Sequence, residues 1–183
     1  MIEGENEFMT DVLFYQNYTY VADISAIVLC IICWLLLHSS YTVREKSLII
    51  FKAGTVCLMM ATVCSISFHT AITRITESRK ILIYVLQDGI YLLLILTFVL
   101  LCNYFGTLLK LEERPARLLG AVSWGGYAVF AFLEIGSPFT HLGFYIDADL
   151  MVHQNFYFDP FRFAYIYYCI VLVVVLFTYR KKF

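Results

Sequence analysis

The residues best suited to chemistry are acidic and aromatic side chains inside a long apolar segment. Asp88 lies seven residues into this segment, with Tyr84 four residues before it, Tyr91 three residues after it and Gln87 beside it. In a helix these positions lie on or next to one face. Because an aspartate that faces lipid at this depth costs about 2–3 kcal/mol, we expect the face to turn toward protein. The sequence therefore predicts a buried polar site that could bind a ligand.

Two further titratable residues are expected at the same depth. His69 ends a polar stripe that begins with Thr62 and Ser65, and Glu134 closes a later apolar segment. Either residue alone would be consistent with simple solvation near the lipid headgroups, where a charge costs little. If the apolar segments are antiparallel helices, both residues join Asp88 in one candidate ligand-binding site.

The segment from 136 to 160, GSPFTHLGFYIDADLMVHQNFYFDP, separates two apolar runs. It contains two histidines and three aspartates but no Lys or Arg. Pro138 is expected to stop the preceding helix, and the aromatic stretches on either side of DADL predict a short β-hairpin. The hairpin would cover the polar site and place His141 near its opening, as a further ligand-binding candidate. Its negative charge suits a cationic or zwitterionic ligand.

Histidines and carboxylates together also raise the question of a metal. The separation of His141 from His153 matches no compact ligand motif, and zinc sites usually show closer spacing. Protonation sensing through histidine is a further alternative. We expect no metal and no cofactor.

The elements that position these residues follow from composition. Of the 183 residues, 61% are hydrophobic and 15% are charged, against about 45–50% and about 25% in soluble domains. Five runs have roughly the 20 apolar residues that a membrane-spanning helix needs: 21–38, 48–68, 81–103, 118–135 and 163–179. The sequence therefore predicts an all-α membrane protein, in which residues 21–183 form a five-helix transmembrane bundle with a small extracytoplasmic β-hairpin between helices 4 and 5. Residues 1–20 are acidic rather than basic, which is unlike a signal peptide, and would form an extracytoplasmic segment.

Basic residues predict the orientation in the membrane. Nine of the thirteen fall on one side: Arg44, Lys46, Lys52, Lys110, Arg114, Arg117, Arg180, Lys181 and Lys182. Because cytoplasmic loops carry the excess of Lys and Arg, we expect the N-terminus outside, the C-terminus in the cytoplasm, and the cell membrane as the location. The loop that holds Arg74, Arg79 and Lys80 argues weakly for the reverse.

Polar residues are unevenly distributed along the predicted spans. Ionisable side chains gather in the outer half, whereas the inner half is mostly Leu, Val and Phe. In the fourth span Ala121, Gly125 and Ala128 have the spacing of small residues at close helix contacts. We therefore expect a polar outer half beneath the hairpin, an inert inner half, and a neighbouring helix packed along this small-residue stripe.

The hairpin segment and the last span resemble a known family. PFTHLGFYID, followed by a turn, an aromatic strand and a span ending in YRKKF, resembles the N-terminal membrane region of GGDEF/EAL-type diguanylate cyclases and phosphodiesterases of Firmicutes. It is similar in plan to the seven-transmembrane N-terminal region of some histidine kinases. The resemblance covers about residues 20–183 and includes residues 138–141, Phe144 and Asp147. The chain departs from it at residues 153–155, His-Gln-Asn, where that family has an Arg/His-Gly-Pro turn.

The resemblance implies a sensory input module that relays an extracytoplasmic or membrane cue to a cytoplasmic output, such as a cyclic-di-GMP cyclase or phosphodiesterase or a kinase. Such regions usually continue with two more spans and an output domain. We therefore expect a fragment of a longer protein, or a module with separate partners. The expected partners are the bilayer, an unknown small ligand or membrane cue, and an output domain in cis or in trans. Homodimerisation is left open, and the lack of a basic patch argues against nucleic acid.

Three other functions are considered beside the sensor. A small transporter or channel subunit is the main alternative, although carriers usually have polar groups through the whole membrane and interrupted helices. A membrane-embedded enzyme would need a cluster of catalytic groups, and Asp88 with His69 falls short of one. Because the sequence contains no catalytic motif, we expect no enzymatic activity from this chain. A purely structural or assembly protein is the third.

Overall fold

The computed structural model describes residues 21–35, 46–73, 75–147, 150, 152–154 and 159–179. Within them, four helices are long and apolar enough to cross a membrane: α2 (Lys46–Ile72), α3 (Lys80–Leu108), α4 (Glu113–Ile135) and α6 (Pro160–Thr178). A fifth apolar helix, Val21–Leu35, is shorter. Because residues 36–38 of the first predicted span lie outside the described residues, the count of five spans stays a prediction. So does the placement of residues 1–20.

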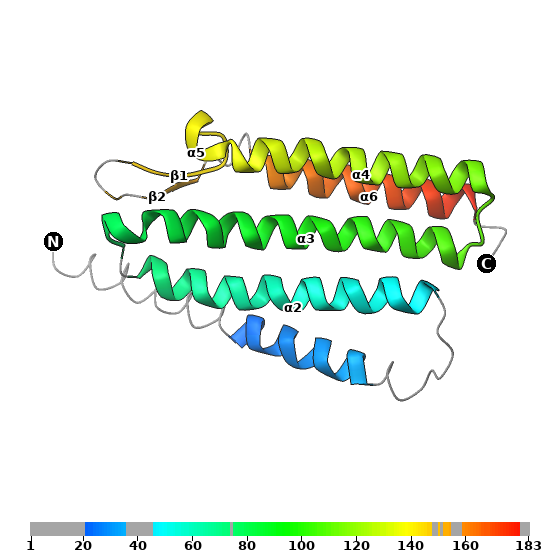
Figure 1. The fold of residues 1–183 in the computed structure, drawn as a ribbon, viewed down its shortest axis with the longest axis horizontal. Helices are drawn as coiled ribbons and strands as arrows, with labels where there is room; N and C mark the ends of the chain where they lie inside the picture. Colours follow the sequence, from blue (N-terminus) through cyan, green and yellow to red (C-terminus); the bar gives the residue numbers. More distant parts are fainter. Residues whose placement is uncertain are drawn as a thin grey trace, which may run out of the picture.

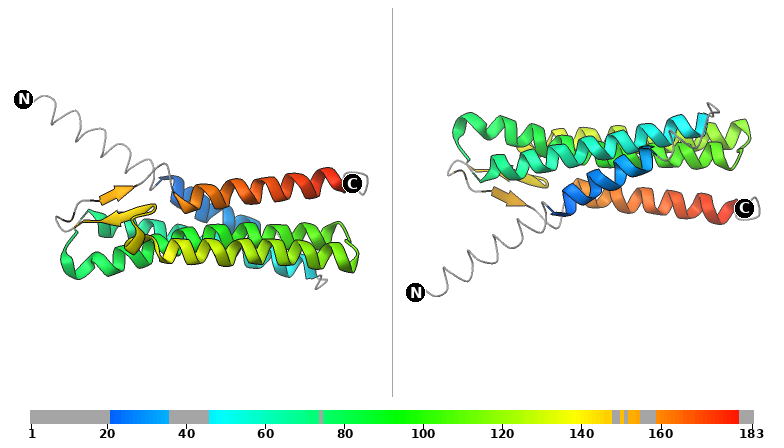
Figure 2. Two further views of the ribbon diagram at one scale, coloured as in Figure 1. Left: turned by 90° about the horizontal axis from the view of Figure 1, so that it is seen from above. Right: turned by 90° about the horizontal axis from the view of Figure 1, so that it is seen from below.

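The central helix of the bundle is α3. It packs against α2, α4 and α6, and α4 also contacts α6. Consecutive long helices run antiparallel, so α2 and α4 end where α3 and α6 begin (Figure 1). The Val21–Leu35 helix crosses α2 at an angle (Figure 2), and the Ser65 hydroxyl on α2 donates to Asp23 Oδ2 at 2.7 Å. We call the end of the bundle where α3 begins the hairpin end, because the strands lie there.

Two helices extend beyond the predicted spans at both ends, whereas α4 and α6 begin earlier than the predicted 118–135 and 163–179 but do not end later. The helix α2 covers the predicted span 48–68 and α3 covers the predicted span 81–103, and each helix begins earlier and ends later than its span. The prediction counted only apolar residues, whereas backbone hydrogen bonding carries a helix on past the hydrocarbon layer. At the start of α6 the Asp159 carboxylate caps the helix by accepting the Phe161 N–H at 3.0 Å, with Pro160 in the first turn. This pairing of cap and proline is typical of helix starts.

The main apolar core joins α3, α4 and α6. It comprises Ile95, Val99, Cys102, Leu119, Phe130, Ala164 and Tyr168. Tyr168 has no solvent exposure, and its hydroxyl donates to the Ser123 carbonyl of α4 at 2.6 Å. A buried tyrosine hydroxyl usually finds such a partner, so this bond helps to fix the rotation of α6 against α4.

The predicted close contact along the small-residue stripe of the fourth span is wrong. Ala121, Gly125 and Ala128 are all exposed. The tight position is instead Gly126, where a β-carbon would lie 2.5 Å from Cε1 of Tyr167 on α6. The spacing of these small residues shows that they share a face of α4, but it does not indicate which face of the helix meets a neighbour.

Between α4 and α6 the chain forms a short helix and two strands. These are α5 (Ser137–Thr140), β1 (Phe144–Ile146) and β2 (Val152–Gln154), and the strands pair antiparallel with Tyr145 opposite His153. The predicted strand pair is therefore present, but Pro138 lies inside α5 and the helix break falls at Gly136 instead. Residues 148, 149, 151 and 155–158 of the predicted turn and second strand lie outside the described part. The extracytoplasmic placement of the strands stays a prediction.

Candidate functional site

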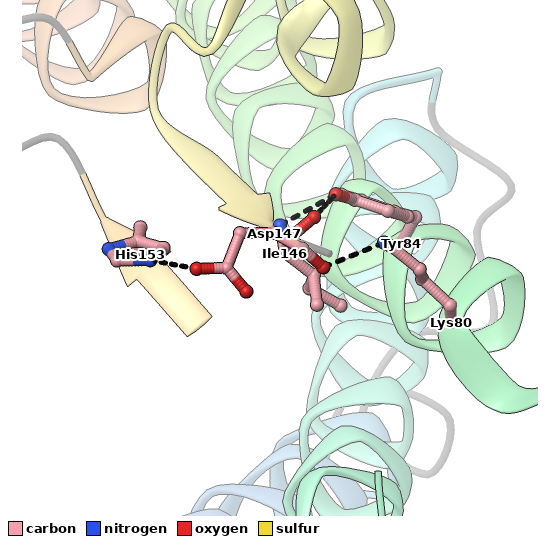
Figure 3. Close-up of polar contacts among 5 residues, drawn as sticks. All are labelled: Lys80, Tyr84, Ile146, Asp147 and His153. Atoms are coloured by element: carbon pink, nitrogen blue, oxygen red, sulfur yellow. Dashed lines mark hydrogen bonds and ion pairs between the residues drawn. The ribbon is translucent and has the colours of Figure 1, made fainter. Parts of the chain in front are cut away.

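The strand β1 is attached to the first turns of α3. The Ile146 N–H donates to the Tyr84 hydroxyl at 2.7 Å, and the Lys80 ammonium donates to the Asp147 carbonyl at 2.9 Å. The Asp147 carboxylate in turn contacts the His153 ring on β2, with Oδ2 2.8 Å from Nε2. Figure 3 shows this chain of polar contacts running from α3 to both strands. The hairpin is therefore held to α3 through side chains one helical turn apart.

Aromatic packing lies beneath the same strand. The Phe144 ring meets Phe68 of α2 and Tyr84 of α3 edge to face, each with ring centroids 5.8 Å apart. Phe144, Ile146, Ile83 and Ala71 form a second buried cluster. Burying this apolar surface keeps β1 against α2 and α3, because the hydrophobic effect favours removal of such rings from water.

The loop before β1 is tied to α5 and lies against α6. The buried Ser137 hydroxyl contacts the carbonyls of Leu142 and Phe144. Gly143 has a φ of 88°, and a β-carbon there would lie 3.1 Å from Cδ of Pro160. Glycine suits this position because it adopts positive φ without strain. The hairpin segment therefore contacts α2, α3 and α5 and lies against the start of α6.

Three carboxyl groups lie at the hairpin end of neighbouring helices. Asp88 comes from α3, Glu134 from α4 and Asp159 from the cap of α6, and the charges of Asp88 and Asp159 act on Glu134. Glu134 is 2% exposed, and its Oε2 has no hydrogen-bond partner. A buried carboxylate oxygen without a partner carries a desolvation cost. Arg162 lies beside Asp159, with Nε 3.8 Å from Oδ2, but at the exposed side of the cluster.

The structure brings several predicted site residues together. Tyr84 contacts the hairpin, Asp88 is half-buried and Gln87 is buried. Tyr91 stacks on Phe161 of α6 with ring centroids 4.5 Å apart. The face of α3 that carries these residues therefore turns toward protein, as its spacing predicts.

Two further predicted residues lie among aromatic side chains. His141 is exposed, and its ring stacks on Tyr145, which stacks on His153, with centroids 4.5 and 4.9 Å apart. His69 is half-buried and lies edge-on to Phe68. His141 sits at a left-handed φ of 57° that ends α5, and this turn directs it to the hairpin surface.

Sequence reasoning missed two members of the site. Asp159 and Ser137 contribute the cap of α6 and the hydroxyl that holds the loop. The Asp-Pro pair ahead of an apolar run is a recognisable helix-start signal and could have identified Asp159. Ser137 gives no such signal, because its role depends on where the loop returns.

The carboxyl groups of the cluster can accept a proton or bind a cation. Among the described residues, no group of three or more His, Cys, Asp or Glu side chains has the geometry to hold a metal ion. No protein-family model, curated protein or solved structure matches this chain.

Proposed function

We propose that this chain is a membrane-embedded sensory input module that binds a cationic cue at its hairpin end. The observation that carries the proposal is the buried Glu134 carboxyl. Its Oε2 has no hydrogen-bond partner, and the charged groups that act on it, Asp88 and Asp159, are also acidic. A positively charged group placed among these carboxyls would supply the missing electrostatic partner. An extracytoplasmic or membrane-derived amine meets this description.

The relay follows from how the hairpin is attached. A cue at the cluster acts on α3 through Asp88, on α4 through Glu134 and on α6 through Asp159. Tyr84 couples α3 to the hairpin, and Ser137 couples α5, the short helix that follows α4, to it. A cue that binds one packing of these helices more tightly than another shifts their equilibrium. The far ends of the helices would pass the shift to a cytoplasmic output domain, in cis or in trans, of the kind that the family resemblance implies.

The proposal is tested by ligand-dependent stability. The purified protein in neutral nanodiscs is unfolded thermally with putrescine or choline, as probes for primary and quaternary amines. A ligand at one hundred times its Kd stabilises by about 2.7 kcal/mol. We expect stabilisation by at least one probe, and its loss in Glu134→Gln and Asp88→Asn.

Glu77→Gln is the matched control, because Glu77 is an exposed carboxylate at the same end of the bundle. Stabilisation that is absent from all proteins, or that survives equally in Glu134→Gln and Glu77→Gln, would remove the cluster as the binding site.

The main alternative, a transporter or channel subunit, has a different requirement. Transport needs a polar path through the membrane, whereas the middle of α3 contributes Ile95 and Val99 to the apolar core. Substrate flux in proteoliposomes would support this alternative over the sensor.

A further inference from the structure

The end of the bundle opposite the hairpin contains an open polar cavity. It has a volume of about 770 Å³ and lies where α2 and α4 begin and α3 ends. Its polar lining comprises Lys46, Ser47, Asn103, Thr107, Lys110, Glu113 and Arg117. The sequence predicts no polar site in this half of the bundle, and its basic residues there indicate only the orientation in the membrane.

The described residues that line the cavity carry a net positive charge. In the described part of the chain, no carboxylate lies within ion-pair distance of Lys46 or Lys110. Arg117 pairs with Glu113, one turn away on α4, so three cations face one carboxylate. Asn103 and Thr107 donate their hydrogens to carbonyls of their own helix. Attraction of an anion therefore depends on the two lysines.

Lys110 is held in the cavity by an unusual backbone conformation. Its φ is 46°, in the left-handed region. The Leu111 N–H donates to the Gly106 carbonyl and the Lys110 N–H to the Thr107 carbonyl, each at 3.2 Å, which is the Schellman pattern of a helix end. Glycine is the usual residue at this position. A lysine held in the conformation that favours glycine suggests a role for its charge.

The wall beside the lysines is apolar. Ile50 of α2, Leu111 of the following loop and Leu119 of α4 line the same cavity. The three helices that form it have the length and composition of membrane spans, so their ends lie near the level of the lipid headgroups. A ligand for this cavity would combine an anionic group with an apolar portion.

We propose that this cavity binds the phosphate headgroup of an anionic phospholipid, with Lys46 and Lys110 on the phosphate and the acyl chains along the apolar wall. Basic pockets between membrane helices are known to recognise headgroups of this kind. Inorganic phosphate shares the anionic chemistry, but it would leave the apolar wall uncovered. The inference does not depend on the proposed sensor function, because it concerns the other end of the bundle.

The test measures lipid binding to the purified protein in neutral detergent. Phosphatidylglycerol is titrated against phosphatidylcholine and inorganic phosphate, with binding followed by native mass spectrometry. Each lysine is expected to contribute about fivefold in affinity, so Lys46→Gln with Lys110→Gln weakens phosphatidylglycerol binding by about 25-fold. Arg114→Gln is the matched control, because Arg114 is an exposed cation in the first turn of α4, at the same end of the bundle, that does not line the cavity. It should change the affinity less than twofold.

Three outcomes would overturn the proposal. Equal weakening by Arg114→Gln would indicate general attraction to a basic surface. Equally tight binding of phosphatidylcholine would show that the site does not select an anionic headgroup. Equally tight binding of inorganic phosphate would show that the ligand is a soluble anion rather than a lipid.

Lys110→Gly separates binding from folding. Glycine fits the left-handed position, so the unfolding temperature without lipid should not fall, while the affinity for phosphatidylglycerol should still drop about fivefold. Unchanged affinity in this variant would also contradict the proposal.

Discussion

Tyr84→Phe tests how the hairpin is held to the bundle. The substitution removes one hydroxyl and keeps the ring that packs edge to face on Phe144. The lost group accepts the Ile146 N–H at 2.7 Å, and Ile146 is 5% exposed. The variant therefore leaves a buried amide without its partner while the surrounding apolar contacts stay in place.

The expected cost follows from that amide. Leaving a buried donor unsatisfied costs about 1–3 kcal/mol, which corresponds to an increase of about 5- to 150-fold in the constant for local opening of the hairpin. Hydrogen–deuterium exchange of the protein in nanodiscs measures this constant directly, because amides in β1 exchange when the strand leaves α3. The core amides of α3 should keep their protection.

Tyr145→Phe is the control for this experiment. Tyr145 lies on the same strand, stacked between His141 and His153, and its hydroxyl makes no hydrogen bond with the residues that the structure describes. Exchange in β1 should stay within about twofold of the wild type, because surface changes of this kind usually cost less than about 0.5 kcal/mol. Unchanged exchange in Tyr84→Phe, or equal acceleration in both variants, would refute attachment through the Tyr84 hydroxyl.

Three further predictions concern the helix contacts. Gly126→Ala should destabilise the protein by about 1–3 kcal/mol in thermal unfolding, because the added methyl would overlap the Tyr167 ring; an unchanged unfolding temperature would show that the ring moves freely. Tyr168→Phe should cost about 1 kcal/mol through its lost bond to α4, and an unchanged stability would contradict this contact. Ser65→Ala should loosen the Val21–Leu35 helix by removing the bond to Asp23, which faster proteolysis near that helix would reveal and unchanged cleavage would exclude.

The two proposed sites lie at opposite ends of one helix. α3 has 29 residues and is therefore about 43 Å long at 1.5 Å per residue. Asp88 lies in its first third, and Lys110 follows its last turn. Between them α3 packs on α2, α4 and α6.

Local features of the chain determined much of the fold. The apolar runs predicted the four long helices, since the backbone can satisfy its hydrogen bonds in lipid only within helices or closed barrels. The alternation of aromatic and polar residues around DADL predicted the strand pair. The spacing of Tyr84, Asp88 and Tyr91 predicted a face turned toward protein, because a buried carboxyl is tolerated only there.

Only the tertiary structure decided which residues meet. α3 and α6 are apolar on nearly every side, so no periodicity in their sequence fixes the rotation of one helix against the next. For this reason the sequence does not indicate that the close contact falls at Gly126 rather than Gly125. Asp159 rather than His141 joins the carboxyl cluster, because a left-handed turn at the end of α5 directs that histidine outward. The cavity around Lys110 likewise exists only once the ends of three separate helices come together.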